Sequence, residues 1–419
     1  MKIVNISHTD KGGAGTAVLR THKRLLELGY NSILYLASDR KPTNTLINRI
    51  DRRFGHRFKK LKAVFFKQRS PVVFSDKVAK YCFFSTSELE KISICSILDN
   101  IDDGDVILMY WLGSKMLNTS NFIQLSKKRK IKLVWYAVDM APITGGCHYF
   151  WECKGYQNSC LNCPVFDGEE KSLAYYQFLS KMKNLRKVSI NLVSPSHVGR
   201  RIFESGSLKF NSYSVLPFAI DTKIFDIQTQ PTGKVTNGFS IFFNAQNIYD
   251  IRKGWSYLKE AIFLLDQLLV MSGTSYNVSI LSVAYDAHVP HFQELKRIKL
   301  INKGGYAIDE RDLAALYQSA DAFICTSTED LNPLMVNEAL LCGIPVIGFN
   351  NASNDEYIEE NRTGNLIKPF DVNQMAQIIF QVISGEIIYL SGKEIRNSVI
   401  ALHESTSWNK KFTEEILNN

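Results

Sequence analysis

The sequence predicts an α/β protein of two Rossmann-like domains, each built on a parallel sheet, that face a cleft. Three observations predict this fold class. The chain has 419 residues, which is enough for two large domains. Short apolar, often β-branched runs alternate with helical stretches in both halves. The polar stretch 228–238, which contains glycine and threonine, lies between the halves and is typical of a domain link.

These two alternations define the expected elements and domains. Strands are predicted at 2–6, 31–36, 105–111, 132–139, 188–196, 239–245, 277–284, 298–304, 321–327, 345–350 and 364–369. Apolar residues at i, i+3, i+4 and i+7 predict helices through 258–265 and 313–320. We expect an N-terminal domain over 1–213, a C-terminal domain over 214–395, and a last helix, 396–419, that packs back on the N-terminal domain.

Composition excludes several classes of protein. Hydrophobic residues make up 45% of the chain and charged residues 22%, which is ordinary for a globular protein and argues against long disorder. No apolar run is long enough to span a membrane. The N-terminus begins with the strand-like run KIVNI rather than with a secretion signal. We therefore expect a cytoplasmic protein.

Positive charge is concentrated in the segment 49–69, which holds nine basic residues against the single acid Asp51 and supplies most of the net charge of +9. Apolar residues recur in it at helical spacing, so the segment predicts a basic amphipathic helix. Such a helix could lie on an anionic membrane surface, which we favour, or form a solvated face over an apolar stripe. Binding to nucleic acid is the third interpretation, but the chain shows no elements that read or stack bases.

The loop after the first strand is rich in glycine. Gly12, Gly13 and Gly15 precede a helix that we expect to begin near Thr16. Their backbone amides and the helix dipole would suit an anionic group, but a tight turn needs small residues as well. A nicotinamide cofactor would find an acid at Asp39, although the glycines do not have the G-x-G-x-x-G spacing.

The most informative segment is 325–346. A strand ends near Ser327, Asn332 is suited to cap a helix, and Pro333 suits the first helical position. The first amides of that helix, at Leu334 and Met335, would then point into the cleft and could bind a phosphate.

Two acids flank this helix start. Asp330 lies in the loop before it, and Glu338 lies about one turn inside the helix. We expect the two carboxylates to contact different parts of one extended ligand. The alternative for Glu338 is a solvated or helix-stabilising acid with no ligand.

This segment resembles the E-x7-E signature of family-four retaining glycosyltransferases, which have the GT-B fold; here the acids are Asp330 and Glu338. The resemblance extends over nearly the whole chain. It includes the run NAQNIYDIRKG at 244–254, which is similar to the phosphate-binding segment of the family, and the glycines at 12–15. The run TGGCHY with the cysteines after it, 144–164, is similar to an insertion in a bacterial branch that makes surface polysaccharides such as capsules and O-antigens.

The resemblance implies a retaining transfer of a sugar from a nucleotide-diphosphate sugar to a hydroxyl, without a catalytic divalent metal. Arg252 and Lys253 would stabilise the leaving diphosphate. Asp330 would hold the sugar, and Glu338 the ribose. The alternative for the basic pair is a helix start on the surface. The N-terminal domain would then be the acceptor side, and the acceptor a lipid-linked glycan at the inner face of the cell membrane, reached through 49–69.

The chain departs from the family pattern at several positions. Val138 precedes Asp139, a donor-binding candidate, where a histidine is usual; Asn244 replaces a glycine; and Ala352-Ser353 replaces a glycine pair. These departures keep open a second hypothesis, a catalytically degenerate GT-B partner subunit that binds a sugar or nucleotide without turnover. A GT-B sugar-nucleotide epimerase is disfavoured, because it would lack the segment from Asp330 to Glu338.

Four cysteines are clustered as C-x5-C-x6-C-x2-C, at Cys147, Cys153, Cys160 and Cys163. Four thiolates satisfy the tetrahedral preference of zinc, so we expect a structural zinc. An iron–sulfur cluster, disulfides and plain packing are the alternatives.

Overall fold

The computed structural model describes residues 1–36, 47–49, 80–82, 87–89, 92, 94–113, 116–166, 172–228, 238–245, 247–273, 277–283, 294–302, 309–351 and 353–418. Within these residues the chain divides into two compact units. Unit 1 comprises 1–195, 200–216 and 411–419, and unit 2 comprises 196–199 and 217–410. The predicted basic helix lies outside the described residues, except for Arg49 at the end of a short strand. Asp39 and Ala352 lie outside them as well.

Unit 1 is built on a seven-stranded parallel sheet with the order β3-β2-β1-β4-β5-β6-β7. Its strands are β1 (Ile3–Ser7), β2 (Ser32–Leu36), β3 (Ile47–Arg49), β4 (Val106–Met109), β5 (Lys132–Tyr136), β6 (Asn191–Ser194) and β7 (Ser212–Val215). Its helices are α1 (Gly12–Glu27), α4 (Cys95–Leu98), α5 (Thr119–Lys128), α6 (Ser172–Leu185) and α7 (His197–Ser205), of which the first residues of α7 belong to unit 2. The β1, β4 and β5 residues are buried almost throughout, as the apolar runs predict.

Unit 2 is built on a six-stranded parallel sheet with the order β10-β9-β8-β11-β12-β13. Its strands are β8 (Gly238–Asn244), β9 (Asn277–Val283), β10 (Ile298–Asn302), β11 (Ala322–Cys325), β12 (Val346–Phe349) and β13 (Gly364–Ile367). Its helices are α8 (Trp255–Met271), α9 (Glu310–Gln318), α10 (Leu334–Leu341), α11 (Val372–Ile383) and α12 (Gly392–His403), followed by α13 (Ser405–Phe412) and a π-helical turn (Thr413–Leu417) that lead into unit 1.

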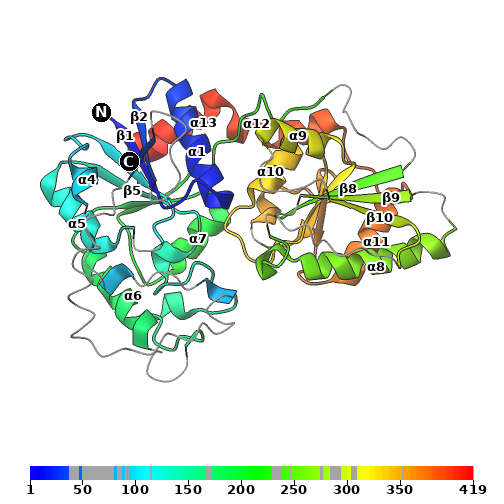
Figure 1. Ribbon diagram of the computed structural model, residues 1–419, viewed down its shortest axis with the longest axis horizontal. Helices are drawn as coiled ribbons and strands as arrows, with labels where there is room; N and C mark the ends of the chain where they lie inside the picture. The colour runs from blue at the N-terminus through cyan, green and yellow to red at the C-terminus, as the bar shows by residue number, and fades with distance from the viewer. Residues whose placement is uncertain are drawn as a thin grey trace. The chain divides into compact units, whose positions relative to one another are not determined.

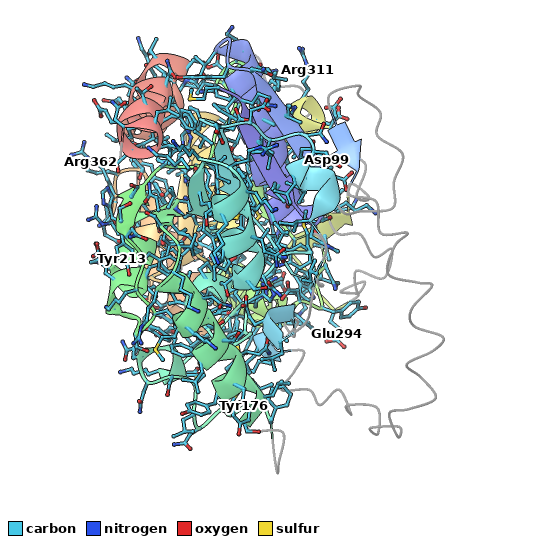
Figure 2. All side chains as sticks on the ribbon, turned by 90° about the vertical axis from the view of Figure 1, so that its left-hand side faces the viewer. Asp99, Tyr176, Tyr213, Glu294, Arg311 and Arg362 are labelled. Carbon is cyan, nitrogen blue, oxygen red and sulfur yellow. The ribbon has the colours of Figure 1, made fainter. Side chains whose placement is uncertain are left out.

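Helices cover both faces of the unit 2 sheet (Figure 1). Successive residues of β8 alternate between two cores: Ile241 and Phe243 pack with α8 and α11, whereas Phe242 packs with α9, α10 and α12. This alternation explains why Ile241, Phe242 and Phe243 are apolar in succession instead of at every second position. Outer helix faces point to solvent instead, as Tyr176 on α6, 55% exposed, shows (Figure 2).

All eleven predicted strands are present, and the parallel two-sheet fold is confirmed. Two strands, β3 and β7, were missing from the prediction. The end of the chain differs too, because α12 belongs to unit 2: the buried Arg396 guanidinium donates hydrogen bonds to the carbonyls of Phe225 and Leu341. Within the described residues, the segment after 395 that clusters with unit 1 begins only at Lys411.

Candidate active site

The strand order of unit 2 defines where a ligand is expected. From β8 the chain continues to β9 and β10 on one side, and it then crosses to β11 on the other side of β8. The loops that follow β8 and β11 therefore leave neighbouring strands in opposite directions, and such a switch point opens a crevice at the carboxyl edge of a parallel sheet. The candidate residues Arg252, Lys253 and Asp330 all lie in these two loops.

The loop after β8 closes in one helical turn, Ile251–Lys253. The Asp250 carboxylate caps this turn by accepting a hydrogen bond from the Arg252 N–H at 3.0 Å. Gly254 ends the turn with φ at +67°, and a Cβ there would lie 2.0 Å from the Thr326 carbonyl oxygen. Only glycine fits this position, because the backbone conformation and the close approach both exclude a side chain.

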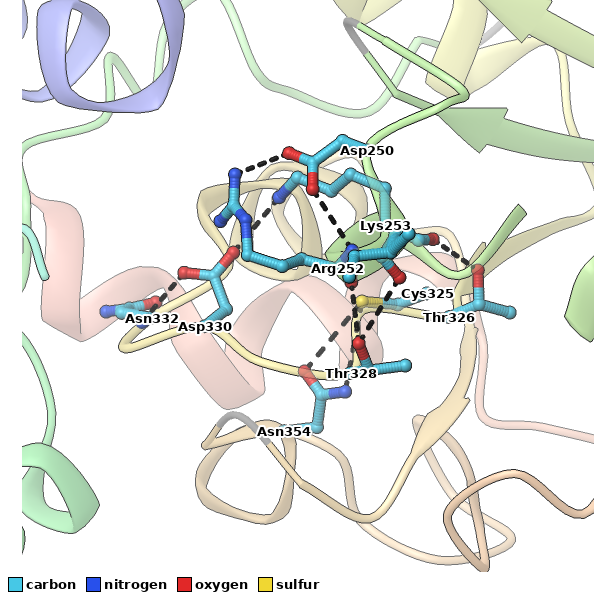
Figure 3. A network of polar contacts seen from close by, with 10 residues as sticks. Asp250, Arg252, Lys253, Cys325, Thr326, Thr328, Asp330, Asn332 and Asn354 are labelled. Carbon is cyan, nitrogen blue, oxygen red and sulfur yellow. Dashed lines mark hydrogen bonds and ion pairs between the residues drawn. The ribbon is translucent and has the colours of Figure 1, made fainter. Parts of the chain in front are cut away.

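Two threonines attach this turn to the loop after β11. The Thr326 hydroxyl donates to the Lys253 carbonyl at 2.7 Å, and the Thr328 N–H donates to the Arg252 carbonyl at 2.7 Å (Figure 3). Hydrogen bonds between the two loops thus fix the backbone from which both basic side chains extend.

Lys253 and Asp330, 77 positions apart in the sequence, form an ion pair with the Lys253 Nζ 3.0 Å from the Asp330 Oδ2 (Figure 3). Burial alone would raise the pKa of Asp330. The positive charges of Lys253 and Arg252 outweigh it, together with hydrogen bonds from Lys253 and from the Asn332 N–H, and the pKa lies below its ordinary value. Asp330 is therefore an ionised carboxylate at neutral pH.

Arg252 is held by the acid that caps its own turn. Its Nη2 contacts the Asp250 Oδ2, and its side chain is 16% exposed. Both basic side chains are largely covered and engaged with acids, which disfavours the interpretation of the pair as a helix start on the surface.

The helix start after Asp330 differs from the prediction by one residue. α10 begins at Leu334, Pro333 is its N-cap, and Asn332 does not cap it. Instead the Asn332 side-chain amide donates to the Tyr357 hydroxyl at 3.1 Å. Proline can take the cap position because it has no N–H to satisfy. The amides of Leu334 and Met335 remain in the first turn, where a helix offers its donors and its positive dipole end.

A second pair of hydroxyls supports the loop before α10. Ser353, with φ at +66°, and Ser196 both donate to the Leu331 carbonyl, at 2.9 and 3.0 Å. Glu356 accepts hydrogen bonds from the backbone N–H groups of His197 and Val198. Ser353, which replaces a glycine, therefore contributes a hydrogen bond that glycine could not make.

Glu338 lies inside unit 2. It is 3% exposed, and its Oε2 accepts a hydrogen bond from the Tyr317 hydroxyl at 2.9 Å. The interpretation of Glu338 as a solvated acid is wrong. A buried carboxylate needs hydrogen-bond donors around it, and the phenol supplies one of them.

The predicted glycine loop of unit 1 belongs to a helix. α1 begins at Gly12 rather than near Thr16, so the glycines form its first turn. A Cβ on Gly15 would lie 2.1 Å from the carbonyl carbon of Asp10, which makes glycine necessary for packing. Gly13 has open space around its Cα, so packing does not explain it.

Asp139 follows β5 and pairs with a histidine that the sequence analysis left without a role. Its Oδ2 lies 2.6 Å from the Nδ1 of His148, and its Oδ1 accepts a hydrogen bond from the Ala141 N–H at 2.8 Å. Both side chains are buried. The indole Nε1 of Trp111, which follows the neighbouring strand β4, lies 3.1 Å from the same His148 nitrogen.

The four clustered cysteines line a small, largely apolar cavity together with Tyr81 and Tyr156. None of the four forms a disulfide. Among the described residues, no group of three or more His, Cys, Asp or Glu side chains is arranged to hold a metal ion, so the structure does not support the predicted zinc. The thiols of Cys147 and Cys163 share a hydrogen bond, which raises the pKa of Cys147 and lowers that of Cys163.

Sequence reasoning missed Asp250, Gly254, Tyr317 and His148. Asp250 could have been recognised as a cap, because it precedes the basic pair by two residues. Tyr317 was assigned to an apolar helix face, which hides a buried hydroxyl. His148 gave no signal, since its pairing with Asp139 depends on the path of the loop between them.

Comparison with known proteins supports a glycosyltransferase domain. Residues 304–398 match the family model described as "Glycosyl transferases group 1", a range that contains Asp330 and Glu338. The putative colanic acid biosynthesis glycosyl transferase WcaC of Escherichia coli K12 is 23% identical over 288 residues. The match covers 65% of this chain and 65% of the length of that relative.

Solved structures share the fold over the whole chain. The pneumococcal O-GlcNAc transferase GtfA, solved with UDP and GlcNAc, has a TM-score of 0.62 at 13% identity and covers 100% of this chain and 99% of its own. HepE of Anabaena, solved with UDP, has a TM-score of 0.59 at 16% identity and covers 100% of both chains. The fold is GT-B, and the sequence of residues 304–398 is similar to the group 1 glycosyl transferases.

Proposed function

We propose that this protein is a retaining glycosyltransferase that moves a sugar from a nucleotide-diphosphate sugar to a hydroxyl of a glycan acceptor. The observation that carries the proposal is the Lys253–Asp330 ion pair at the switch point of unit 2. A cation and a carboxylate fixed at one crevice can bind a phosphate and a sugar hydroxyl at the same time.

The donor diphosphate would be bound by the two basic side chains and by the first amides of α10. Breaking the bond between the anomeric carbon and the phosphate oxygen develops negative charge on the diphosphate. Arg252 and Lys253 stabilise that charge more in the transition state than in the ground state. The UDP named in the GtfA and HepE structures supports a nucleoside diphosphate as the leaving group.

The carboxylates would position the rest of the donor. Asp330 accepts hydrogen bonds from the sugar, and Glu338 accepts them from the ribose. Neither is proposed as a covalent nucleophile. In the retaining step, the acceptor oxygen bonds to the anomeric carbon on the face from which the diphosphate departs. The acceptor proton passes to the leaving phosphate oxygen, so the step needs no other base. Arg252 and Lys253 neutralise the charge on the diphosphate in place of a catalytic divalent metal.

The acceptor is proposed to be a lipid-linked glycan of a surface polysaccharide such as a capsule or O-antigen. The name of the WcaC relative supports polysaccharide biosynthesis. The basic charge of 49–69 supports attachment to an anionic membrane at its cytoplasmic face. None of the helices among the described residues combines the length and apolar content needed to cross a bilayer.

Turnover of a nucleotide-sugar panel by the purified full-length chain tests the proposal. The expected result is release of nucleoside diphosphate. The new glycosidic bond should have the same anomeric configuration as the donor sugar, as measured by proton nuclear magnetic resonance. Binding of a nucleotide sugar without any turnover, also with lipid-linked acceptors, would instead favour the degenerate partner subunit. The replacement of a histidine by Val138 is the observation that favours this alternative.

A further inference from the structure

A buried hydrogen bond joins α9 to Glu338 on α10. The Tyr317 hydroxyl on α9 donates to the Glu338 Oε2 at 2.9 Å. Both side chains are buried, with Tyr317 completely covered and Glu338 3% exposed.

The Tyr317 ring is held in place by the core of unit 2. Its ring is completely buried and packs edge-on against Phe242, with ring centroids 4.9 Å apart, and against Phe323 at 5.2 Å. Aromatic packing of this kind restricts the ring to one orientation. The hydroxyl position is therefore set by the core, and the core in turn sets the position of the Glu338 Oε2.

Fixing one oxygen of a carboxylate fixes the plane of the whole group, and with it the direction of the second oxygen. A carboxylate held this way is pre-organised to accept hydrogen bonds from a ligand, which lowers the entropy cost of binding.

We infer that Tyr317 is a positioning residue that orients Glu338 toward the ribose hydroxyls of the donor nucleotide. This inference rests on the proposed function, because it takes Glu338 as the ribose-binding acid. It adds that the preference for ribose depends on a tyrosine that acts through Glu338.

Calorimetric titration of the full-length chain tests this inference. UDP, GDP and ADP are each compared with their 2′,3′-dideoxy analogues, on wild type, Tyr317→Phe and Glu338→Gln. Loss of one hydrogen bond to a carboxylate should weaken binding of the ribonucleotide about tenfold in Tyr317→Phe. Binding of the dideoxy analogue should not change, because it has no hydroxyls for Glu338.

Tyr389→Phe is the matched control, since its hydroxyl also donates to a side chain of unit 2, Asn365, away from Glu338. It should leave the ratio of ribo to dideoxy affinities at the wild-type value. A crystal structure of the wild type with UDP keeps the test decisive if Tyr317→Phe does not fold, because the inference requires the Tyr317 hydroxyl to contact one Glu338 oxygen while the ribose contacts the other. A ratio that falls in Glu338→Gln but not in Tyr317→Phe would overturn the inference alone. A wild type that binds none of the three nucleotides would overturn the proposed function together with it.

Discussion

Substitution of Lys253 and substitution of Asp330 should have opposite effects on nucleotide binding. Lys253→Met removes a cation that we assign to the diphosphate, so UDP should bind more weakly. Asp330→Asn removes a negative charge next to that diphosphate and releases Lys253 from its partner, so UDP should bind more tightly. A pair that serves only stability would show no such opposition.

The size of the effects follows from the geometry. At 3.0 Å, two unit charges attract by about 5 kcal/mol at an effective dielectric constant of about 20. The two side chains are 20% and 18% exposed, so desolvation and solvent screening leave a net coupling of about 1–2 kcal/mol. Release of Lys253 should therefore tighten UDP binding about fivefold in Asp330→Asn, since 1.4 kcal/mol corresponds to about tenfold.

Two assays on the single and double variants measure these quantities. Urea denaturation without ligand gives the coupling free energy between the two side chains in a double-mutant cycle. Lys253→Met should be the more destabilised single variant, because it leaves the Asp330 carboxylate without its cation. Calorimetry with UDP gives the affinities. Equal weakening of UDP binding by Lys253→Met and Asp330→Asn, or a coupling near zero, would refute the reasoning.

Three further outcomes are expected. Because the pKa of Asp330 is lowered in the folded state, the stability that its charge contributes should be present above pH 3.8 and lost as the pH falls further. Urea titrations of wild type and Asp330→Asn from pH 7 to 3 check this. A loss of this contribution between pH 7 and 5 would contradict it. Gly254→Ala should destabilise the protein by at least about 2 kcal/mol, because of its clash with Thr326, whereas Gly273→Ala, with the same φ but open space, should cost only about 1 kcal/mol in the same assay. The four clustered cysteines should react as thiols after denaturation without reductant, because none of them forms a disulfide; a thiol count that falls short by two would contradict this.

The fold was largely accessible from the sequence, because burial on both faces forces parallel strands to be apolar throughout. The helix through 258–265 was predicted correctly for a related reason: Leu258, Ala261, Ile262 and Leu265 are all buried on one face. β7 was missed because Ser212 and Ser214 interrupt its apolar pattern. Its place at the edge of the sheet allows this, since only one neighbour pairs with it.

The site was accessible only in part. The expectation that Lys253 and Asp330 serve one donor site came from the resemblance to family-four glycosyltransferases, and the 3.0 Å ion pair agrees with it. Local signals were less reliable: Pro333, not Asn332, takes the cap of α10. The partners of Glu338 and Asp139 could not be predicted, because Tyr317 and His148 reach them through packing that no local pattern encodes.

A crystal structure of the full-length chain with a bound nucleoside diphosphate would test the central claim most directly. We expect a diphosphate oxygen within hydrogen-bond distance of the Lys253 Nζ, and the ribose at Glu338. A nucleotide bound elsewhere, with Lys253 still paired to Asp330, would contradict the account.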